Sequence, residues 1–523
     1  MSGPALPRPP LGLGEDELAA RFAELQEKLV PQWQFMNRLH ASPYTTVVVP
    51  SVSLDVDFPA TVLRAYEERL LFLLLLLRQP RARIVYVTSL PIHPDIVDYY
   101  LALLPGVIPS HARKRLVTIA AHDASSRPLT EKLLVRPRLL ERVREAAGDP
   151  DSAHLAPFMT TELERELALR LGIPMYGADP KFWAYGTKSG GRKLFAAVGV
   201  PHPAGAEDLR SVADLTAALA DLRAARPTLT EALVKLDEGV SGEGNARVDL
   251  SDLPEPGTGG ERAALTERLR ALRCEREDLS AAAFLDQAAA GGAVIEERIR
   301  GEEFTSPSVQ LRVSPLGEVQ LLSTHDQLLG GPSGQAFLGC VFPAAPSYAP
   351  AIAELAAQVG KRLADEGVIG RFAVDFVVVR DRSGAWQPYA IEVNLRKGGT
   401  THPFLTLEFL TGGRYDPAAA RFVAPSGSAK CYVASDHFEA DVFRALDVDD
   451  LFDFAIRHRL HFDQSTQTGI VYHMLSSVTE FGRFGVTAVG DSHHQARALY
   501  DQAVAGLERE AKAALVAKPL SAL

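Results

Sequence analysis

The stretch of sequence that decides the fold is Ala390-Ile-Glu392-Val-Asn394-Leu-Arg396. Its apolar residues alternate with polar ones, which is typical of a strand with one buried face. Successive side chains of a strand point to opposite faces, so Glu392, Asn394 and Arg396 are expected on the same face. A carboxylate, an amide oxygen and a guanidinium would therefore line one surface.

A second strand-like segment, Val374-Asp375-Phe376, precedes this stretch and supplies another carboxylate. Burying two carboxylates side by side is costly unless a cation neutralises them. A few hard oxygen ligands suit Mg²⁺, which also binds substrate phosphates. The alternative is a pair of solvent-facing carboxylates on a hairpin, but the alternation of Glu392, Asn394 and Arg396 favours a Mg²⁺ site with Asp375, Glu392 and Asn394 as ligands.

A lysine followed by a glycine-rich segment indicates a phosphate site. The apolar run Ala232-Leu-Val ends at Lys235, and the next residues include Gly239, Ser241, Gly242 and Gly244. Glycines let backbone N–H groups approach phosphate oxygens, and the lysine adds a positive charge. A hairpin turn beside a surface lysine is the alternative. The segment Gly186-Thr-Lys188-Ser-Gly-Gly191-Arg-Lys193 is not a P-loop, because Arg-Lys-Leu stands where Gly-Lys-Ser/Thr is required.

A third candidate binding segment, for a purine base and its ribose, is the acidic stretch Glu296-Glu-Arg-Ile299-Arg-Gly-Glu-Glu303, which follows another apolar run. The end of a strand can present a backbone edge and an acceptor to a purine base, and a carboxylate on the next strand can accept from ribose hydroxyls. A solvated run of charges is the alternative reading of this segment.

Composition limits the class of protein. The chain has 523 residues, 46% hydrophobic and 23% charged, which predicts two to four globular domains. A net charge of −10 with scattered basic residues gives no reason to expect nucleic acid. Three widely spaced cysteines predict a reducing, cytoplasmic environment. The apolar run 70–77 is too short to cross a bilayer, so we expect a buried helix and no membrane.

Strand and helix patterns predict the domain organisation. β-Branched runs near residues 45, 83 and 115 alternate with helical stretches at 59–77 and 130–147, which indicates a doubly wound α/β domain. Two α+β blocks and a small α+β unit follow. Within the last, we expect a helix at 450–460, paired strands at 469–475 and 485–489, and a final amphipathic helix. The predicted ranges are a flexible tail at 1–14, the N-terminal domain at 15–180, blocks at 181–300 and 301–424, a linker at 424–429 and the C-terminal unit at 430–523. Within the first block, we expect a polar mobile loop with an exposed helix at 249–279.

The order and spacing of these motifs resemble the ATP-grasp superfamily. The resemblance covers residues 150–412 and implies a two-block ATP-grasp fold after a pre-ATP-grasp-like domain. It also implies ATP and Mg²⁺ as cofactors. The implied nucleotide contacts are Lys188, Lys235, the loop with Gly239, Ser241, Gly242 and Gly244, Glu296 with the adenine amine, Ile299 with the ring through its backbone, and Glu303 with the ribose. The implied metal ligands are Asp375, Glu392 and Asn394, and the implied catalytic groups are Lys235, Arg396 and Arg371.

Finer features favour one branch of this superfamily. Residues 392–404 and the segment Gly469-Ile-Val-Tyr-His-Met-Leu resemble peptide ligases of the pheganomycin type. The carboxylase branch fits less well. His402 falls one residue later than the corresponding histidine of that branch, and Thr400-Thr401 of this chain stands where that branch has an acidic residue. The resemblance thus implies a carboxylate–amine ligase that forms an amide through an acyl-phosphate.

Two other functions stay open at this point: a carboxylate kinase that releases a phosphorylated product, and a nucleotide-binding scaffold without turnover. The expected partners are a small-molecule carboxylate and an amine or peptide acceptor, with a homodimer as a further possibility. His325-Asp326-Gln327 is a candidate for the acceptor side, and buried core residues are the alternative. Residues 328–338 are the candidate substrate-pocket loop.

Overall fold

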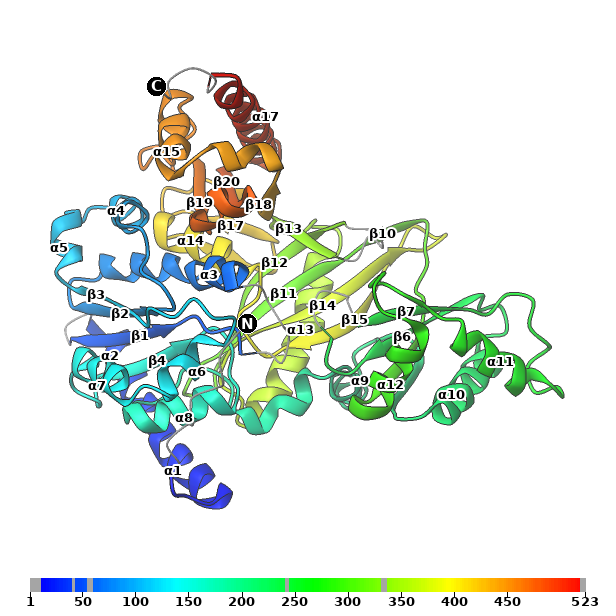
Figure 1. The fold of residues 1–523 in the computed structure, drawn as a ribbon. Coiled ribbons are helices and arrows are strands. Elements are labelled where there is room, and N and C mark those ends of the chain that lie inside the picture. Colours follow the sequence, from blue (N-terminus) through cyan, green and yellow to red (C-terminus); the bar gives the residue numbers. More distant parts are fainter. Residues whose placement is uncertain (1–10, 40–42, 54–59, 240–243, 331–335, 518–523) are drawn as a thin grey trace.

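The structure is a computed structural model that describes residues 11–39, 43–53, 60–239, 244–330 and 336–517 (Figure 1). Three sheets, one N-terminal and two from the rest of the chain, carry most of the fold. Residues 1–10 of the predicted tail, Ser241 and Gly242 of the predicted phosphate loop and part of the predicted pocket loop lie outside the described residues.

The N-terminal sheet has four parallel strands in the order β3-β2-β1-β4. Helices cover both faces in Figure 1, which is why the valines of β1 are fully buried. The predicted doubly wound α/β domain is confirmed. The strands are β1 (Tyr44–Val49), β2 (Ala82–Thr88), β3 (Leu116–Ala120) and β4 (Ala153–Pro157). The helices are α1 (Glu15–Glu27), α2 (Leu29–Leu39), α3 (Ala60–Glu68), α4 (Pro94–Ala102), α5 (Pro109–Arg113), α6 (Leu129–Leu134), α7 (Pro137–Ala147) and α8 (Glu162–Leu171).

Two predicted helices are each divided in two. The stretch 130–147 breaks into α6 and α7 because Pro137 opens α7, and proline disfavours helical backbone in the residue before it. The stretch 59–77 becomes α3 and the 3₁₀ helix η1 (Leu71–Arg78), six of whose residues are buried. The apolar run is thus a buried helix, as predicted. Among the described residues, no helix is both long and apolar enough to span a bilayer.

The first of the two α+β blocks contains a five-stranded sheet in the order β5-β9-β6-β7-β8, antiparallel throughout. The predicted mobile loop at 249–279 contains a packed helix, α11, whose Leu265 and Leu269 are fully buried. The strands are β5 (Gly205–Leu209), β6 (Glu231–Leu236), β7 (Asn245–Asp249), β8 (Arg273–Cys274) and β9 (Ala293–Glu297). The helices are η2 (Pro180–Gly186), α9 (Lys188–Val198), α10 (Val212–Ala225), α11 (Glu261–Arg270) and α12 (Ala281–Gly291).

The second block belongs to a nine-stranded antiparallel sheet that continues into the C-terminal unit. Its path is β10-β14-β11-β12-β13-β18-β20-β19, and β15 pairs with β14. The strands of the block are β10 (Glu303–Thr305), β11 (Pro307–Val313), β12 (Val319–Gly330), β13 (Ala336–Phe342), β14 (Gly370–Arg380) and β15 (Trp386–Asn394). The helices are α13 (Ala349–Asp365) and α14 (Thr401–Thr411).

The C-terminal unit has no sheet of its own, since β18 pairs with β13 over four residues. The predicted linker at 424–429 is a tight turn, in which the Ala424 N–H donates to the Ser428 carbonyl at 2.9 Å. The predicted helix at 450–460, the strand pair and the final helix are all confirmed. A separate two-stranded sheet, β16 (Arg414–Asp416) and β17 (Arg421–Val423), precedes the unit. The elements of the unit are β18 (Cys431–Glu439), η3 (Asp441–Ala445), α15 (Val448–Arg457), β19 (Gly469–His473), η4 (Leu475–Ser477), α16 (Val478–Phe481), β20 (Arg483–Gly490) and α17 (His493–Ala517).

We expect Leu74→Ala to lower the free energy of unfolding by about 2–5 kcal/mol, because this η1 side chain is fully buried in the largest hydrophobic cluster. Ile108→Ala is the matched control, since Ile108 is 70% exposed, and should change stability by less than about 0.5 kcal/mol. Urea denaturation followed by circular dichroism measures both. Equal losses would contradict the assignment of η1 to the core.

Candidate active site

Two carboxylates lie opposite each other at the end of the nine-stranded sheet where β15 pairs with β14. Asp375 on β14 pairs directly with Glu392 on β15. Asn394 donates its Nδ2 to Asp375 Oδ2 at 3.0 Å and to Glu392 Oε1 at 2.9 Å. The predicted shared face of Glu392 and Asn394 is therefore confirmed, and Asp375 joins it from the neighbouring strand.

Lys188 is the positive charge closest to this pair, because it opens α9 and forms an ion pair with Glu392. Burial on its own would raise the pKa of Glu392, but the Lys188 ammonium group, the Asn394 amide and the charge of Arg396 together outweigh burial and lower that pKa to about 2. Burial, reinforced by the negative charge of Glu392, raises the pKa of Asp375 to about 6. Lys188 forms an ion pair with Glu392, whereas Asp375 has none among the described residues and is offset only by the charges of Arg396 and Lys188 without direct contact.

Gly239 and Gly244, which border the predicted phosphate loop, lie close together between β6 and β7. The Leu236 N–H donates to the Gly244 carbonyl at 2.8 Å. A Cβ added to Gly239 would lie 3.1 Å from the Cα of Gly244, and one added to Gly244 would lie 3.0 Å from the Cα of Gly239. A side chain at either position would require the facing backbone to shift by a few tenths of an ångström, so this close approach favours glycine at the neck of the loop.

Lys235 lies just before this loop, where its Nζ is 2.6 Å from Glu296 Oε2. Arg192 of α9 donates to the other oxygen of Glu296 at 3.0 Å. Both cations lower the pKa of Glu296 against the effect of burial, with Lys235 the stronger. The Glu296 carboxylate is thus held by two cations. An adenine amine that binds Glu296 would have to displace Lys235 or Arg192, or share the carboxylate with them.

The other predicted nucleotide residues flank the junction between the two blocks. Ile299 is half-buried in the segment between β9 and β10. Glu303 is exposed on β10 and binds Arg380 at 2.8 Å. Their predicted contacts with a purine ring and a ribose remain predictions.

The two predicted arginines lie in different surroundings: Arg396 is influenced by both carboxylates of the acidic pair, whereas the charges around Arg371 are those of Arg312, Tyr176 and Glu408. Arg396 lies two residues beyond the end of β15, where burial lowers its pKa and the carboxylates of Glu392 and Asp375 oppose that change. Arg371 is on β14 and has an Nη1 atom without a hydrogen-bond partner among the described residues. Burial lowers the pKa of Arg371 to about 10, and the positive charge of Arg312 adds to the effect. A buried guanidinium with a free donor can bind an anionic group of a substrate.

The sequence reasoning missed two groups beside the site. Ser308 of β11 lies opposite Asp375 and hydrogen-bonds its carboxylate. Lys397 donates to the Pro157 carbonyl at the end of β4, and burial lowers its pKa to about 7. The basic pair Arg396-Lys397 was a local signal for the lysine. No local sequence signal indicates Ser308, because only strand pairing brings this residue to Asp375.

His325 is a core residue, which settles one alternative left open by the sequence. The side chain is fully buried, and its Nε2 lies 2.6 Å from the Tyr432 hydroxyl. Its ring also contacts those of Phe342 and Phe404. Asp326 accepts from the Tyr348 hydroxyl at 2.7 Å and the Ala345 N–H at 3.0 Å. These contacts disfavour His325 as an acceptor-side residue.

Comparison with known proteins agrees with this architecture. Residues 182–271 and 272–418 match the family described as IQCH-like, ATP-grasp. Residues 85–173 match the Pre ATP-grasp domain and residues 451–503 the PGM1 C-terminal domain. In its fold the chain is similar to biotin carboxylase from Campylobacter jejuni, with a TM-score of 0.53 and 12% identity over 90% of this chain and 95% of that one.

Two relatives match along the sequence. The L-propargylglycine--L-glutamate ligase of Streptantibioticus cattleyicolor is 30% identical over 440 residues, which cover 82% of this chain and 86% of the relative. The IQ motif-containing protein H of Danio rerio is 26% identical over 362 residues, which cover 61% of this chain but only 34% of that protein.

The two-block fold, the preceding α/β domain and the paired acidic strands define an ATP-grasp enzyme. Within that superfamily, this chain belongs to the family of carboxylate–amine ligases that includes L-propargylglycine--L-glutamate ligase. The predicted fold class and the predicted branch, pheganomycin-type ligases, are both confirmed.

Replacing Lys235 should weaken nucleotide binding more than replacing Lys193. Lys235 is buried at the phosphate loop, whereas Lys193 is 54% exposed and pairs with Asp208 on the surface. Loss of one charged hydrogen-bond donor corresponds to about 10- to 100-fold in ATP affinity, so Lys235→Ala should fall in that range. Lys193→Ala should stay within about twofold of the wild type. Isothermal titration calorimetry with a non-hydrolysable ATP analogue measures both, and equal losses would reject the assigned phosphate site.

Proposed function

We propose that this chain uses ATP and Mg²⁺ to join a carboxylate to the amine of an amino acid or peptide, through an acyl-phosphate. The observation that supports this most directly is the cluster of Asp375, Glu392 and Asn394, with Arg396 immediately beyond it. The name of the Streptantibioticus relative describes a ligation between two amino acids, which is the same class of reaction.

The acidic cluster fits a magnesium ion by its chemistry. The Asn394 amide lies within hydrogen-bonding distance of both carboxylates, and Lys188 forms an ion pair with only one of them. Asp375, Glu392 and Asn394 would hold Mg²⁺ through oxygen atoms, the ligands this ion prefers. The ion, when bound, supplies positive charge that stabilises a phosphoryl group during transfer.

The lysines and the glycine loop would hold the phosphates of ATP. Lys188 and Lys235 are each paired with a glutamate in this structure, so each could exchange that partner for phosphate oxygens. Gly239 and Gly244 form the neck of a loop that can direct backbone N–H groups toward a phosphate. Glu296, Ile299 and Glu303 would bind the nucleoside, with the backbone of the hinge contacting the base.

Arg396 would act on the acyl group. The substrate carboxylate attacks the γ-phosphorus of ATP and ADP leaves, which gives an acyl-phosphate. The amine then attacks the carbonyl carbon, phosphate leaves, and a proton is lost from nitrogen. The guanidinium of Arg396 lies beside the acidic pair, where it can stabilise the developing oxyanion. Arg371, with its free buried donor, would orient the same anionic group.

The substrates are small molecules, in keeping with the ligase family. We further propose that the chain acts in the cytoplasm, that neither nucleic acid nor a membrane is a partner, and that a homodimer is the assembly to test. The domain ranges 15–180, 181–424 and 430–523 are proposed as the units to use in truncation experiments, although β13 and β18 join the last two.

Glu392→Gln and Asp375→Asn should each abolish ATP turnover, because each removes one negative charge from the metal site. Circular dichroism should show an unchanged fold. The measurement is phosphate release against a panel of carboxylate and amine pairs over a range of Mg²⁺ concentrations. Wild-type turnover of either variant at limiting Mg²⁺ would contradict the metal assignment.

Arg396→Lys separates a ligase from its alternatives. A single ammonium group cannot replace the planar fork of a guanidinium, so amide formation should fall about 10²- to 10³-fold while ATP affinity stays near wild type. Calorimetry gives the affinity and mass spectrometry gives the amide yield on the same preparation. Should the wild type release a phosphorylated carboxylate, the function would be that of a kinase, and absence of turnover with every pair would indicate a scaffold. Collapse of ATP affinity in the variant would instead make Arg396 a nucleotide ligand.

A further inference from the structure

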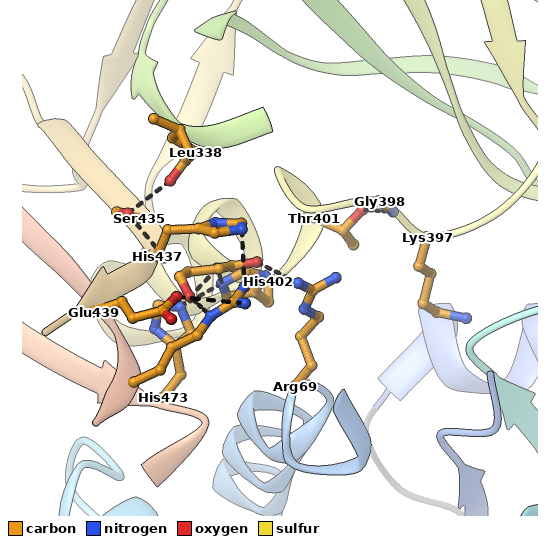
Figure 2. Close-up of polar contacts among 12 residues, drawn as sticks. Arg69, Leu338, Lys397, Gly398, Thr401, His402, Ser435, His437, Glu439 and His473 are labelled. Atoms are coloured by element: carbon orange, nitrogen blue, oxygen red, sulfur yellow. Dashed lines mark hydrogen bonds and ion pairs between the residues drawn. The ribbon is translucent and has the colours of Figure 1, made fainter. Parts of the chain in front are cut away.

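Three buried side chains from separate elements converge at a point outside the site described above (Figure 2). His402 lies in the first turn of α14, Asp436 on β18 and His473 at the end of β19. They are 3%, 2% and 4% exposed, so water cannot satisfy their polar atoms. Asp436 lies within a β-bulge of β18, a feature that redirects side chains from a sheet.

The contacts among the three ligand atoms form a closed triangle. His473 Nε2 lies 2.9 Å and His402 Nε2 lies 3.2 Å from the same oxygen, Oδ1 of Asp436. The two Nε2 atoms are themselves 3.0 Å apart. All three sides of the triangle are therefore as short as hydrogen bonds.

Protons alone cannot satisfy this triangle. A carboxylate oxygen only accepts, so each imidazole would have to donate its Nε2–H to Oδ1 of Asp436. Both nitrogens would then carry hydrogens, and the third side would bring two donors together at 3.0 Å. If one imidazole instead accepted from the other, its lone pair would face the carboxylate oxygen. One side of the triangle is repulsive in either arrangement.

A metal ion removes this conflict, because all three atoms then direct lone pairs at one cation. Ligand atoms about 2.1 Å from a metal lie about 3 Å apart at right angles and about 3.4 Å apart in a tetrahedron, so the observed sides are close to both and nearer to the right-angled arrangement. We propose that His402, Asp436 and His473 bind one divalent transition-metal ion, of the Zn²⁺ or Fe²⁺ type. Two imidazoles and one carboxylate suit such ions better than the all-oxygen ligands that Mg²⁺ prefers.

The surroundings support a built site. Arg69 forms an ion pair with Oδ2 of Asp436, which leaves Oδ1 free to bind as a single ligand atom. A ligating carboxylate held by such an outer partner is usual at metal centres. Gly485 lies opposite His473 on β20, and a Cβ at that position would overlap the His473 ring. Only glycine leaves room for the imidazole in this orientation.

The proposed ion would join the C-terminal unit to the catalytic segment. His402 directly follows Thr401, whose hydroxyl accepts from the Gly398 N–H at 3.0 Å and donates to Gln310. Figure 2 shows Gly398 and Thr401 of this turn beside Arg69 and His402. Arg396 lies two residues before this turn, so the ion would fix the end of the segment that carries Arg396. This site is separate from the Mg²⁺ site proposed at Asp375 and does not depend on it.

The test is the metal content of the full-length chain, purified without a histidine tag and dialysed against excess Mg²⁺. Mass spectrometry of the elements should find about one equivalent of a transition metal per chain. His473→Gln should lose at least about 90% of it, since a missing ligand costs more than the 10- to 100-fold of an outer partner. His437→Gln is the matched control, because His437 lies next to Asp436 but contacts Arg483, and it should keep the metal. Asp375→Asn should also keep it, which separates this site from the nucleotide site.

A second measurement does not depend on whether the variants fold. The wild-type chain, stripped with a chelator and given Co²⁺, should develop visible absorption bands, and Zn²⁺ should raise its Tm. An Asp375→Asn chain that loses the metal would place the ion at the nucleotide site and overturn the proposal. So would equal metal content in the His473→Gln and His437→Gln chains. If the wild-type chain contains no transition metal and also fails to bind Co²⁺, the proposal is wrong and the three side chains form a polar cluster without a metal.

Discussion

The pairing of β14 with β15 is the interaction on which the rest of the site depends. It sets Asp375 against Glu392 and brings Asn394 within hydrogen-bonding distance of both. Two carboxylates this close repel each other in a buried environment, so their surroundings must supply positive charge. Lys188 supplies part of it from α9, which means that the first block and the second block meet through an ion pair at the reacting centre.

The same requirement explains how cations are distributed around the sheet. Lys235 and Arg192 share the buried carboxylate of Glu296, so the cations of the first block are held in place by an acidic partner. Arg371 and Lys397 differ, because burial lowers the pKa of both and no carboxylate binds either one closely among the described residues. Such groups are costly to bury without an anion. An anionic substrate group at that position would compensate them.

The C-terminal unit is packed into the same body of the chain that carries the candidate active site. Its strands extend the sheet that carries the acidic pair, and its polar residues meet His402 and Arg69 beside the catalytic segment. A separately folded appendage would bury little against the rest of the chain. Here the longest hydrophobic cluster runs from η1 through β13 and α14 into β18 and α17. The packing therefore couples the C-terminal unit to the position of the loop after β15.

Much of this protein was determined by the sequence alone. Alternating polarity in residues 390–396, the lysine before a glycine-rich segment and the apolar runs of the N-terminal domain are local patterns, and local patterns specify strands, turns and their faces. They were sufficient to predict the fold class, the shared face of Glu392 and Asn394, and the last helix. Pro137 is also a local signal, because it opens α7 and so divides the helix predicted at 130–147.

Tertiary structure alone decided the contacts between distant segments. Nothing near Ser308 in the sequence indicates that it faces Asp375, and nothing near Glu296 indicates that two cations hold it. The same is true of the triangle of His402, Asp436 and His473, whose members are separated by 34 and 37 residues. Such contacts arise from strand register and helix packing, which depend on the sum of many weak interactions across the chain. A sequence read segment by segment shows which side chains are available, and only the folded chain shows which of them share a buried space.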